Sequence, residues 1–119
     1  MRVIIAGGRD FRDRKLMDEV MEKYKVEVTA VCCGGARGAD SLGRAWARDN
    51  GIEVLEFPAY WDLYENAAGP LRNKEMAQNG DFLVAFWDGK SKGTKNMIKT
   101  MKACGKHGEV IIYEKNLQV

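Results

Sequence analysis

The chain is poor in the residues that build metal sites and disulfide frameworks. Among its 119 residues there is one histidine, His107, and three cysteines, Cys32, Cys33 and Cys104, none of them in a CxxC pair. A structural zinc site is therefore not expected, and the odd number of cysteines favours reduced thiols. No run approaches the ~18 apolar residues of a membrane span, and the first residues do not read as a signal peptide. We expect a cytoplasmic protein without membrane contact.

An excess of charge of one sign is also missing. The 19 basic residues stand against 17 acidic ones, which gives a net charge of +2. This balance argues against a protein that coats nucleic acid through bulk electrostatics, although it leaves room for a local basic patch. Apolar residues make up 45% and charged residues 30% of the chain, which is ordinary for a globular protein. The length predicts one domain spanning residues 1–119.

Short apolar runs alternate with amphipathic segments along the chain. The predicted strands cover residues 2–6, 29–33, 52–57, 81–87 and 110–113. The predicted helices cover residues 13–25, 39–50, 70–79 and 94–104, and an aromatic loop covers residues 58–69. Continuous apolar strands that alternate with helices predict a parallel sheet covered on both faces. We expect a Rossmann-like α/β fold, a three-layer α/β/α domain whose five-stranded parallel sheet has the order 3-2-1-4-5.

Three of the predicted strands are followed by a glycine-rich segment that carries a cation. The first glycine loop is residues 7–10 (Gly-Gly-Arg-Asp), the second is residues 34–40 (Gly-Gly-Ala-Arg-Gly-Ala-Asp), and the third is residues 89–94 (Gly-Lys-Ser-Lys-Gly-Thr). Glycine lets backbone N–H groups approach a ligand closely, and a following helix start adds partial positive charge. In the expected strand order these loops meet in one crevice, where the winding direction reverses. They predict a phosphate-bearing, nucleotide-type ligand.

Several side chains in these loops have both a ligand-binding and a structural interpretation. Arg37 can offer a bidentate fork to a phosphate. Asp40 either caps the second predicted helix or accepts a hydrogen bond from a ribose hydroxyl, and Thr94 either caps the last helix or binds the ligand. Arg9 and Asp10 either pair with each other or face the ligand.

Residues outside the glycine loops have similar alternatives. Arg72 and Asn73 either reach a phosphate or base or form the solvated first turn of a helix. Tyr60 and Trp61 either stack on a base or pack on the protein's own core. His107 is expected to be an exposed turn residue, and the cysteines of the second strand are expected to be core residues.

Four motifs together resemble a known family over nearly the whole chain. They are Gly-Gly-Arg-Asp-Phe (7–11), the second glycine loop, Ala-Gly-Pro-Leu-Arg-Asn-Lys-Glu-Met (68–76) and the third glycine loop. In this order they resemble the YspA-related branch of the SLOG superfamily, named for the DNA-processing protein Smf/DprA and for LOG, a cytokinin-activating phosphoribohydrolase. The resemblance implies a Rossmann-like domain that binds a nucleotide-derived small molecule such as an ADP-ribose derivative or a nucleoside phosphate. No cofactor is required, a phosphate-bound Mg²⁺ is compatible with the residues, and the frequent dimers among SLOG relatives make a homodimer conceivable.

The chain departs from the catalytic pattern of the LOG enzymes. Its third glycine loop is similar to their Pro-Gly-Gly-x-Gly-Thr-x-x-Glu motif, but Met97 stands where the glutamate would fall. Arg72 matches the arginine of their Arg-Lys motif, although Asn73 follows it. A thioether cannot act as an acid, a base or an electrostatic partner for a ribosyl cation. The resemblance therefore supports binding and does not support LOG-type hydrolysis.

The leading prediction is a module that senses or sequesters a nucleotide-type ligand. One alternative is a nucleotide hydrolase that acts on an N-glycosidic or phosphate linkage with Asp10, Asp40 or Asp88. The other is a single-stranded DNA-binding module that uses lysines 90, 92, 95, 99 and 102. The predicted ligand-binding residues are Gly7, Gly8, Arg9, Asp10, Gly34, Gly35, Ala36, Arg37, Gly38, Asp40, Arg72, Asn73, Gly89, Ser91, Gly93 and Thr94.

Overall fold

Five parallel strands form one sheet in the order β3-β2-β1-β4-β5. The structure is a computed structural model that describes residues 1–114. Its strands are β1 (Arg2–Gly7), β2 (Ala30–Cys33), β3 (Glu53–Glu56), β4 (Phe82–Trp87) and β5 (His107–Ile112). Its helices are α1 (Arg14–Glu22), α2 (Ala39–Asp49), α3 (Trp61–Tyr64), the 3₁₀ turn η1 (Glu65–Ala67), α4 (Ala68–Asn79) and α5 (Lys92–Ala103). The predicted Rossmann-like fold and strand order are confirmed.

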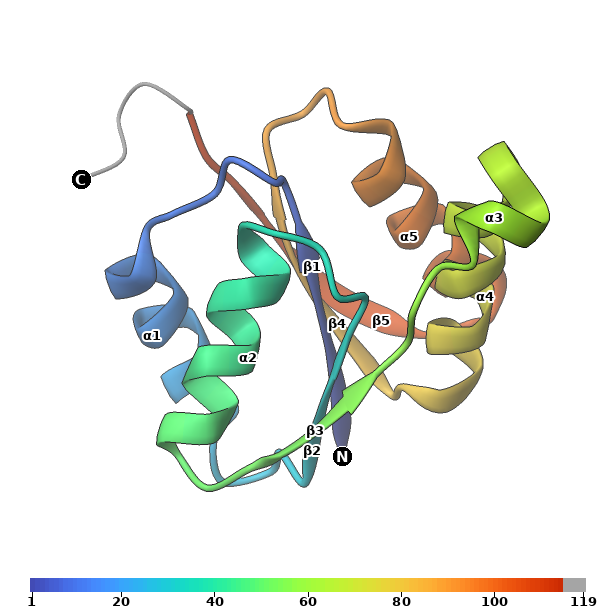
Figure 1. Cartoon of the computed structure of the whole chain (residues 1–119). Helices are drawn as coiled ribbons and strands as arrows, with labels where there is room; N and C mark the ends of the chain where they lie inside the picture. The colour runs from blue at the N-terminus through green and yellow to red at the C-terminus, as the bar shows by residue number, and fades with distance from the viewer. Residues whose placement is uncertain (115–119) are drawn as a thin grey trace.

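Helices cover both faces of the sheet. Figure 1 shows α1 and α2 on one side of the strands and α4 and α5 on the other. Successive side chains of a strand point to opposite faces, so Val3 and Ile5 join the core under α1 and α2, whereas Ile4 and Ala6 join the core under α4 and α5. This double burial explains the continuous apolar runs of the strands. Within residues 1–114, no helix combines the length and apolarity needed to cross a membrane.

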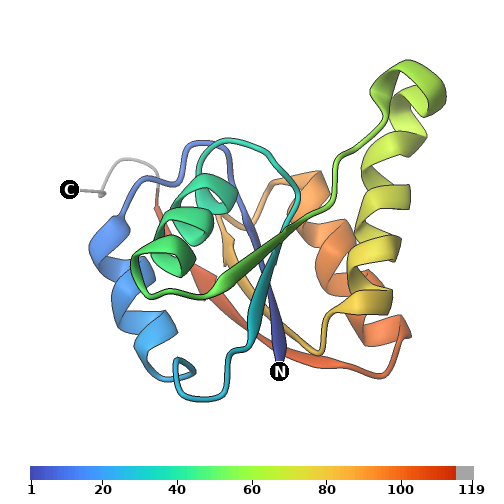
Figure 2. The same cartoon turned by 60° about the horizontal axis from the view of Figure 1, so that its bottom comes forward.

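The segment predicted as an aromatic loop contains a short helix. Figure 2 shows α3 projecting from the body of the molecule at the end of α4. Its neighbourhood exposes large apolar side chains, with exposed fractions of 55% for Tyr60, 51% for Trp61, 73% for Leu63 and 51% for Tyr64. Of the two alternatives for Tyr60 and Trp61, packing on the protein's own core is therefore wrong. Because the helix buries no face, its sequence lacks the periodic pattern that indicates a helix.

Two other boundaries differ from the sequence expectation. Helix α4 begins at Ala68, so Pro70 lies within its first turn, where no backbone N–H donor is needed. Strand β5 begins at His107, which is exposed as expected but belongs to a strand and not to a turn. It is an edge strand, and Gly108 allows it to pack closely on Leu83 of β4, because an added Cβ would lie 2.5 Å from the Leu83 carbonyl oxygen.

The adjacent cysteines of β2 are core residues, as predicted. Cys32 and Cys33 have exposed fractions of 0% and face opposite sides of the sheet. Burial raises the pKa of the Cys32 thiol to about 11 and that of the Cys33 thiol to about 12. Both therefore stay protonated and unreactive at neutral pH.

Candidate functional site

The carboxyl edge of the sheet carries a cavity of about 800 Å³, here called the main cavity. Its walls come from the first glycine loop, the third glycine loop, part of the second and the start of α4. Figure 2 shows the loops after β1, β2 and β4 along the same edge of the sheet. The predicted ligand-binding residues that line it are Gly7, Gly8, Arg9, Asp10, Ala36, Asp40, Arg72, Asn73, Ser91, Gly93 and Thr94. Segments far apart in the chain thus meet where the winding direction reverses.

A smaller cavity of about 270 Å³ adjoins the main one and is here called the arginine cavity. Gly34, Gly35 and Arg37 of the second glycine loop line it. The two cavities share four lining residues, Arg9, Ala36, Trp61 and Arg72. The described lining of both cavities lacks two of the predicted ligand-binding residues, Gly38 and Gly89. The structure therefore brings most of the predicted residues to one edge and divides them between two adjoining spaces.

The first and second glycine loops are joined through their backbones. The amide of Ala39 donates a hydrogen bond to the Gly8 carbonyl at 3.1 Å, and the Gly8 amide donates to the Phe86 carbonyl at 3.1 Å. Gly38 has a φ of +74°, and a Cβ there would lie 2.2 Å from the Gly8 carbonyl oxygen. Only glycine meets both demands. Gly38 therefore serves the packing of the two loops.

Asp40 closes the second glycine loop from inside. Its side chain is buried, with an exposed fraction of 6%, and accepts a hydrogen bond from the Ala36 amide at 3.1 Å. Burial raises the pKa of the carboxyl, while hydrogen bonds from the Ala36 and Gly34 amides and the charge of Arg72 act in the opposite direction. The N-cap of α2 is Gly38, so the prediction of Asp40 as the helix cap is wrong.

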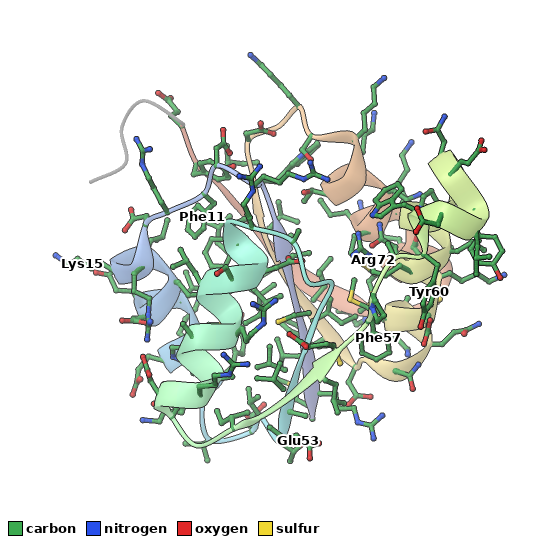
Figure 3. All side chains as sticks on the ribbon, in the orientation of Figure 1. Phe11, Lys15, Glu53, Phe57, Tyr60 and Arg72 are labelled. Carbon is green, nitrogen blue, oxygen red and sulfur yellow. The ribbon has the colours of Figure 1, made fainter. Side chains whose placement is uncertain are left out.

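Arg72 extends from α4 to the second glycine loop. Figure 3 labels its side chain, whose Nη1 donates to the Gly34 carbonyl at 2.7 Å. A Cβ at Gly34 would lie 2.3 Å from this Nη1, so glycine is needed for the close approach. Burial lowers the pKa of Arg72; the negative charge of Asp40 acts in the opposite direction, and the positive charge of Arg9 adds to the lowering. The prediction of a solvated first turn is wrong, because the guanidinium is half-buried and borders both cavities.

Asn73 connects α4 to α5 at the wall of the main cavity. It is buried, with an exposed fraction of 5%, and its Oδ1 accepts from Arg72 Nε at 3.0 Å. Its Nδ2 donates to the Gly93 carbonyl at 3.2 Å and to Asn96 Oδ1 at 2.9 Å. Asn96 also lines the main cavity, and sequence reasoning missed it. In the sequence, Asn96 is marked only as a polar residue within a predicted helix.

The third glycine loop is a tight turn held by its own side chains. Asp88 Oδ1 accepts hydrogen bonds from the amides of Lys90 and Ser91, both at 2.8 Å. The N-cap of α5 is Ser91, whose hydroxyl accepts from the Thr94 amide at 3.5 Å. The prediction of Thr94 as the cap is wrong, because the helix begins two residues earlier and Thr94 is buried in its first turn.

Asp10 is hydrogen-bonded to Tyr113 and is not paired with Arg9. The Tyr113 hydroxyl donates a hydrogen bond to Asp10 Oδ1, and the ion pairs of residues 1–114 do not include one between Arg9 and Asp10. Burial and this hydrogen bond raise the pKa of Tyr113. Of the two alternatives for Arg9 and Asp10, the one in which they pair with each other is therefore wrong. Within the described part of the chain, no three His, Cys, Asp or Glu side chains are grouped so that they could hold a metal ion.

Fold and cavity together define a Rossmann-like domain with a glycine-loop site at the carboxyl edge of its parallel sheet. The family described as "YspA, cpYpsA-related SLOG family" matches residues 1–64, and the chain belongs to this family. The match includes the first two glycine loops, while the third loop and Arg72 lie beyond it. The resemblance inferred from the sequence motifs is thereby confirmed.

Two individual proteins are similar to the chain. The Gene 61 protein of Mycobacterium phage D29 is 36% identical in an alignment that covers 87% of this chain and 90% of that protein. The crystal structure of DNA processing protein A (DprA) from Streptococcus pneumoniae matches with a TM-score of 0.76 and 16% identity. That match covers 95% of this chain and 50% of DprA, so the chain spans half the length of this structural neighbour. At this identity the likeness shows a shared fold.

Proposed function

We propose that the protein binds a nucleotide or nucleotide-derived ligand in the main cavity and serves as a sensor or sequestering module. The observation that carries the proposal is the convergence of three glycine loops on one space of about 800 Å³. Membership of the SLOG family supports a nucleotide- or DNA-related role in general. The three free cysteines suit a reducing compartment, so the proposed location is the cytoplasm.

The start of α5 is the proposed phosphate-binding part of the main cavity. Ser91, Gly93 and Thr94 line the cavity at the start of this helix, where the helix carries partial positive charge. The Ser91 amide donates to Asp88 and the Thr94 amide to the Ser91 hydroxyl. The backbone donor offered to a phosphate there is therefore the Gly93 amide. Lys90 and Lys92 border the same space and are exposed. A phosphate there would meet a backbone donor and cations together.

Binding is favoured over turnover. Met97 lines the cavity at the position where the LOG motif carries glutamate, and each alternative aspartate already accepts a hydrogen bond. Asp10 accepts from Tyr113, Asp40 from the Ala36 amide, and Asp88 from the turn of the third glycine loop. These carboxylates hold the loops in place.

Single-stranded DNA is the second candidate ligand. Lysines 90 and 92 border the main cavity, lysines 95, 99 and 102 are exposed on α5, and the half-exposed Trp61 lies at the rim. Cations beside an exposed aromatic ring are typical of surfaces that hold an unpaired strand. Binding of a fluorescent oligonucleotide that weakens steeply with added salt would favour this candidate.

Nuclear magnetic resonance with AMP and ADP tests the nucleotide proposal. We expect amide shifts concentrated in the first glycine loop and in residues 91–96. Lys92→Gln should weaken the affinity about threefold to tenfold, because it removes one cation from the cavity wall. Lys99→Gln is the matched control, since Lys99 is exposed on the same helix and lies outside the cavity. Millimolar nucleotide that leaves all these amides unshifted would refute the proposal.

A further inference from the structure

Three arginine side chains from separate segments border the arginine cavity. Arg9 follows β1, Arg37 lies in the second glycine loop, and Arg72 extends from α4. Their meeting depends on the fold, because the residues are far apart in the chain. A guanidinium fork matches the geometry of phosphate and carboxylate groups, and three of them border one small space, two from exposed side chains and one from the half-buried Arg72.

Two of these three arginines have no carboxylate partner in the described part of the chain. Arg9 and Arg37 make no ion pair or side-chain hydrogen bond within residues 1–114, whereas Arg72 donates to the Gly34 carbonyl and to Asn73. The nearby carboxylate of Asp40 is buried and accepts hydrogen bonds from the loop amides. The negative charge of Asp40 raises the pKa of Arg72, and the positive charge of Arg9 lowers it, so Arg9 lies close enough to repel this guanidinium. An external anion would relieve this repulsion.

The dimensions of the two cavities differ in a way that suits two parts of one ligand. The arginine cavity, at about 270 Å³, holds roughly nine water volumes, enough for one phosphate or carboxylate with its nearest waters. The main cavity is about 800 Å³ and has room for a nucleoside. Trp61 borders both and is half-exposed, so its ring offers a flat face to a base between them.

We propose that the arginine cavity is a second anion site, and that the ligand carries two separate anionic groups. One group lies at the start of α5 in the main cavity, and the other lies among Arg9, Arg37 and Arg72. This inference rests on the proposed function for the placement of the nucleotide itself. It narrows the ligand to nucleotides that bear a second phosphate or carboxylate away from the first.

The first experiment probes the arginine cavity alone with inorganic phosphate at constant ionic strength. We expect amide shifts at Gly34 and Gly35 that saturate with phosphate and disappear in Arg37→Gln. Arg48→Gln is the matched control, because Arg48 is exposed on α2 and lines neither cavity. Arg9→Gln provides an independent second variant. Shifts that are absent in the native protein, or unchanged in both cavity variants, would overturn the second anion site.

The second experiment compares AMP with adenosine 3′,5′-bisphosphate by isothermal titration calorimetry. We expect the bisphosphate to bind at least about tenfold tighter, equivalent to about 1.4 kcal/mol. Arg37→Gln should abolish this advantage, so that the bisphosphate binds no tighter than AMP, while Arg48→Gln should keep it. Equal affinity of both ligands for the native protein would overturn the two-anion ligand. Phosphate shifts at Gly34 without binding of either nucleotide would support the anion site and reject the proposed function.

Discussion

Replacing Met97 with glutamate tests whether the floor of the main cavity is apolar. Met97 has an exposed fraction of 1% and packs with Met76 and Met101 in the core under α4 and α5. It also borders the main cavity and occupies the position of the LOG-type glutamate. The substitution therefore asks whether this fold can accept that carboxylate. We expect Met97→Glu to destabilise the protein at neutral pH without producing a hydrolase.

The magnitude follows from burial of the new carboxyl group. A fully buried carboxyl has its pKa raised by several units, to about 7 or above. Since glutamate in the unfolded chain has a pKa of about 4.3, ionisation there favours unfolding by about 4 kcal/mol at pH 7. A carboxyl whose pKa is raised in the folded state lowers the stability of the protein only at pH values at which the same carboxyl is ionised in the unfolded chain. The loss of stability in Met97→Glu should therefore be nearly absent at pH 4. It should grow as the pH rises toward the pKa of the new carboxyl in the folded protein.

Urea unfolding at pH 4 and pH 7 measures this effect, with Met97→Gln as the matched polar control. Both variants bury a polar group of similar size, so their difference isolates the charge. We expect the two free energies of unfolding to agree at pH 4 and to differ by about 4 kcal/mol at pH 7. Equal stability at both pH values would mean that water reaches this side chain. The conclusion that Met97 lies in an apolar part of the cavity wall would then be wrong, and the hydrolase alternative would regain support.

Two further predictions concern stability. Gly43→Ala should destabilise the protein by about 1 kcal/mol in urea unfolding, because a Cβ would lie 2.7 Å from Ile5 Cγ2. This overpacking outweighs the higher helix propensity of alanine. Gly93→Ala is the control, since a Cβ at Gly93 would meet open space. Glu109→Gln should cost about 0.5 kcal/mol at pH 7, because hydrogen bonding from Lys23 lowers the pKa of Glu109. That cost should vanish as the pH falls through the folded pKa, and a loss that persists at pH 2 would contradict the ion-pair explanation.

The sheet could be predicted because its three central strands, β2, β1 and β4, are buried on both faces. The run from Phe82 to Trp87 is apolar throughout, since β4 lies between β1 and β5 and is covered by helices. The same reasoning fails for α3, whose side chains are exposed, and for the start of β5, an edge strand that contains an exposed histidine and a glycine. Periodic apolar patterns reveal helices and strands that bury one face, whereas α3 and the start of β5 bury few side chains.

The candidate site could be predicted as a set of loops but not as a set of contacts. Parallel topology alone brings the ends of β1, β2 and β4 to one edge, so the glycine loops were identifiable from the sequence. Which hydroxyl caps α5 depends on where that helix begins, and Ser91 and Thr94 are both suitable residues. The hydrogen bonds of Asn73 to Gly93 and Asn96 depend on the packing of two helices, which a linear pattern does not encode.

The contact between Gly8 and Gly38 means that neither loop can be lengthened independently. These glycines are thirty positions apart in the chain, yet the carbonyl of one occupies the space that a side chain of the other would need. An insertion in the second loop would displace the turn that carries Arg9, and an insertion in the first would displace Arg37. Natural variation in loop length is therefore expected in the segment around α3, which projects away from the contact between the two glycine loops, and not in these loops themselves.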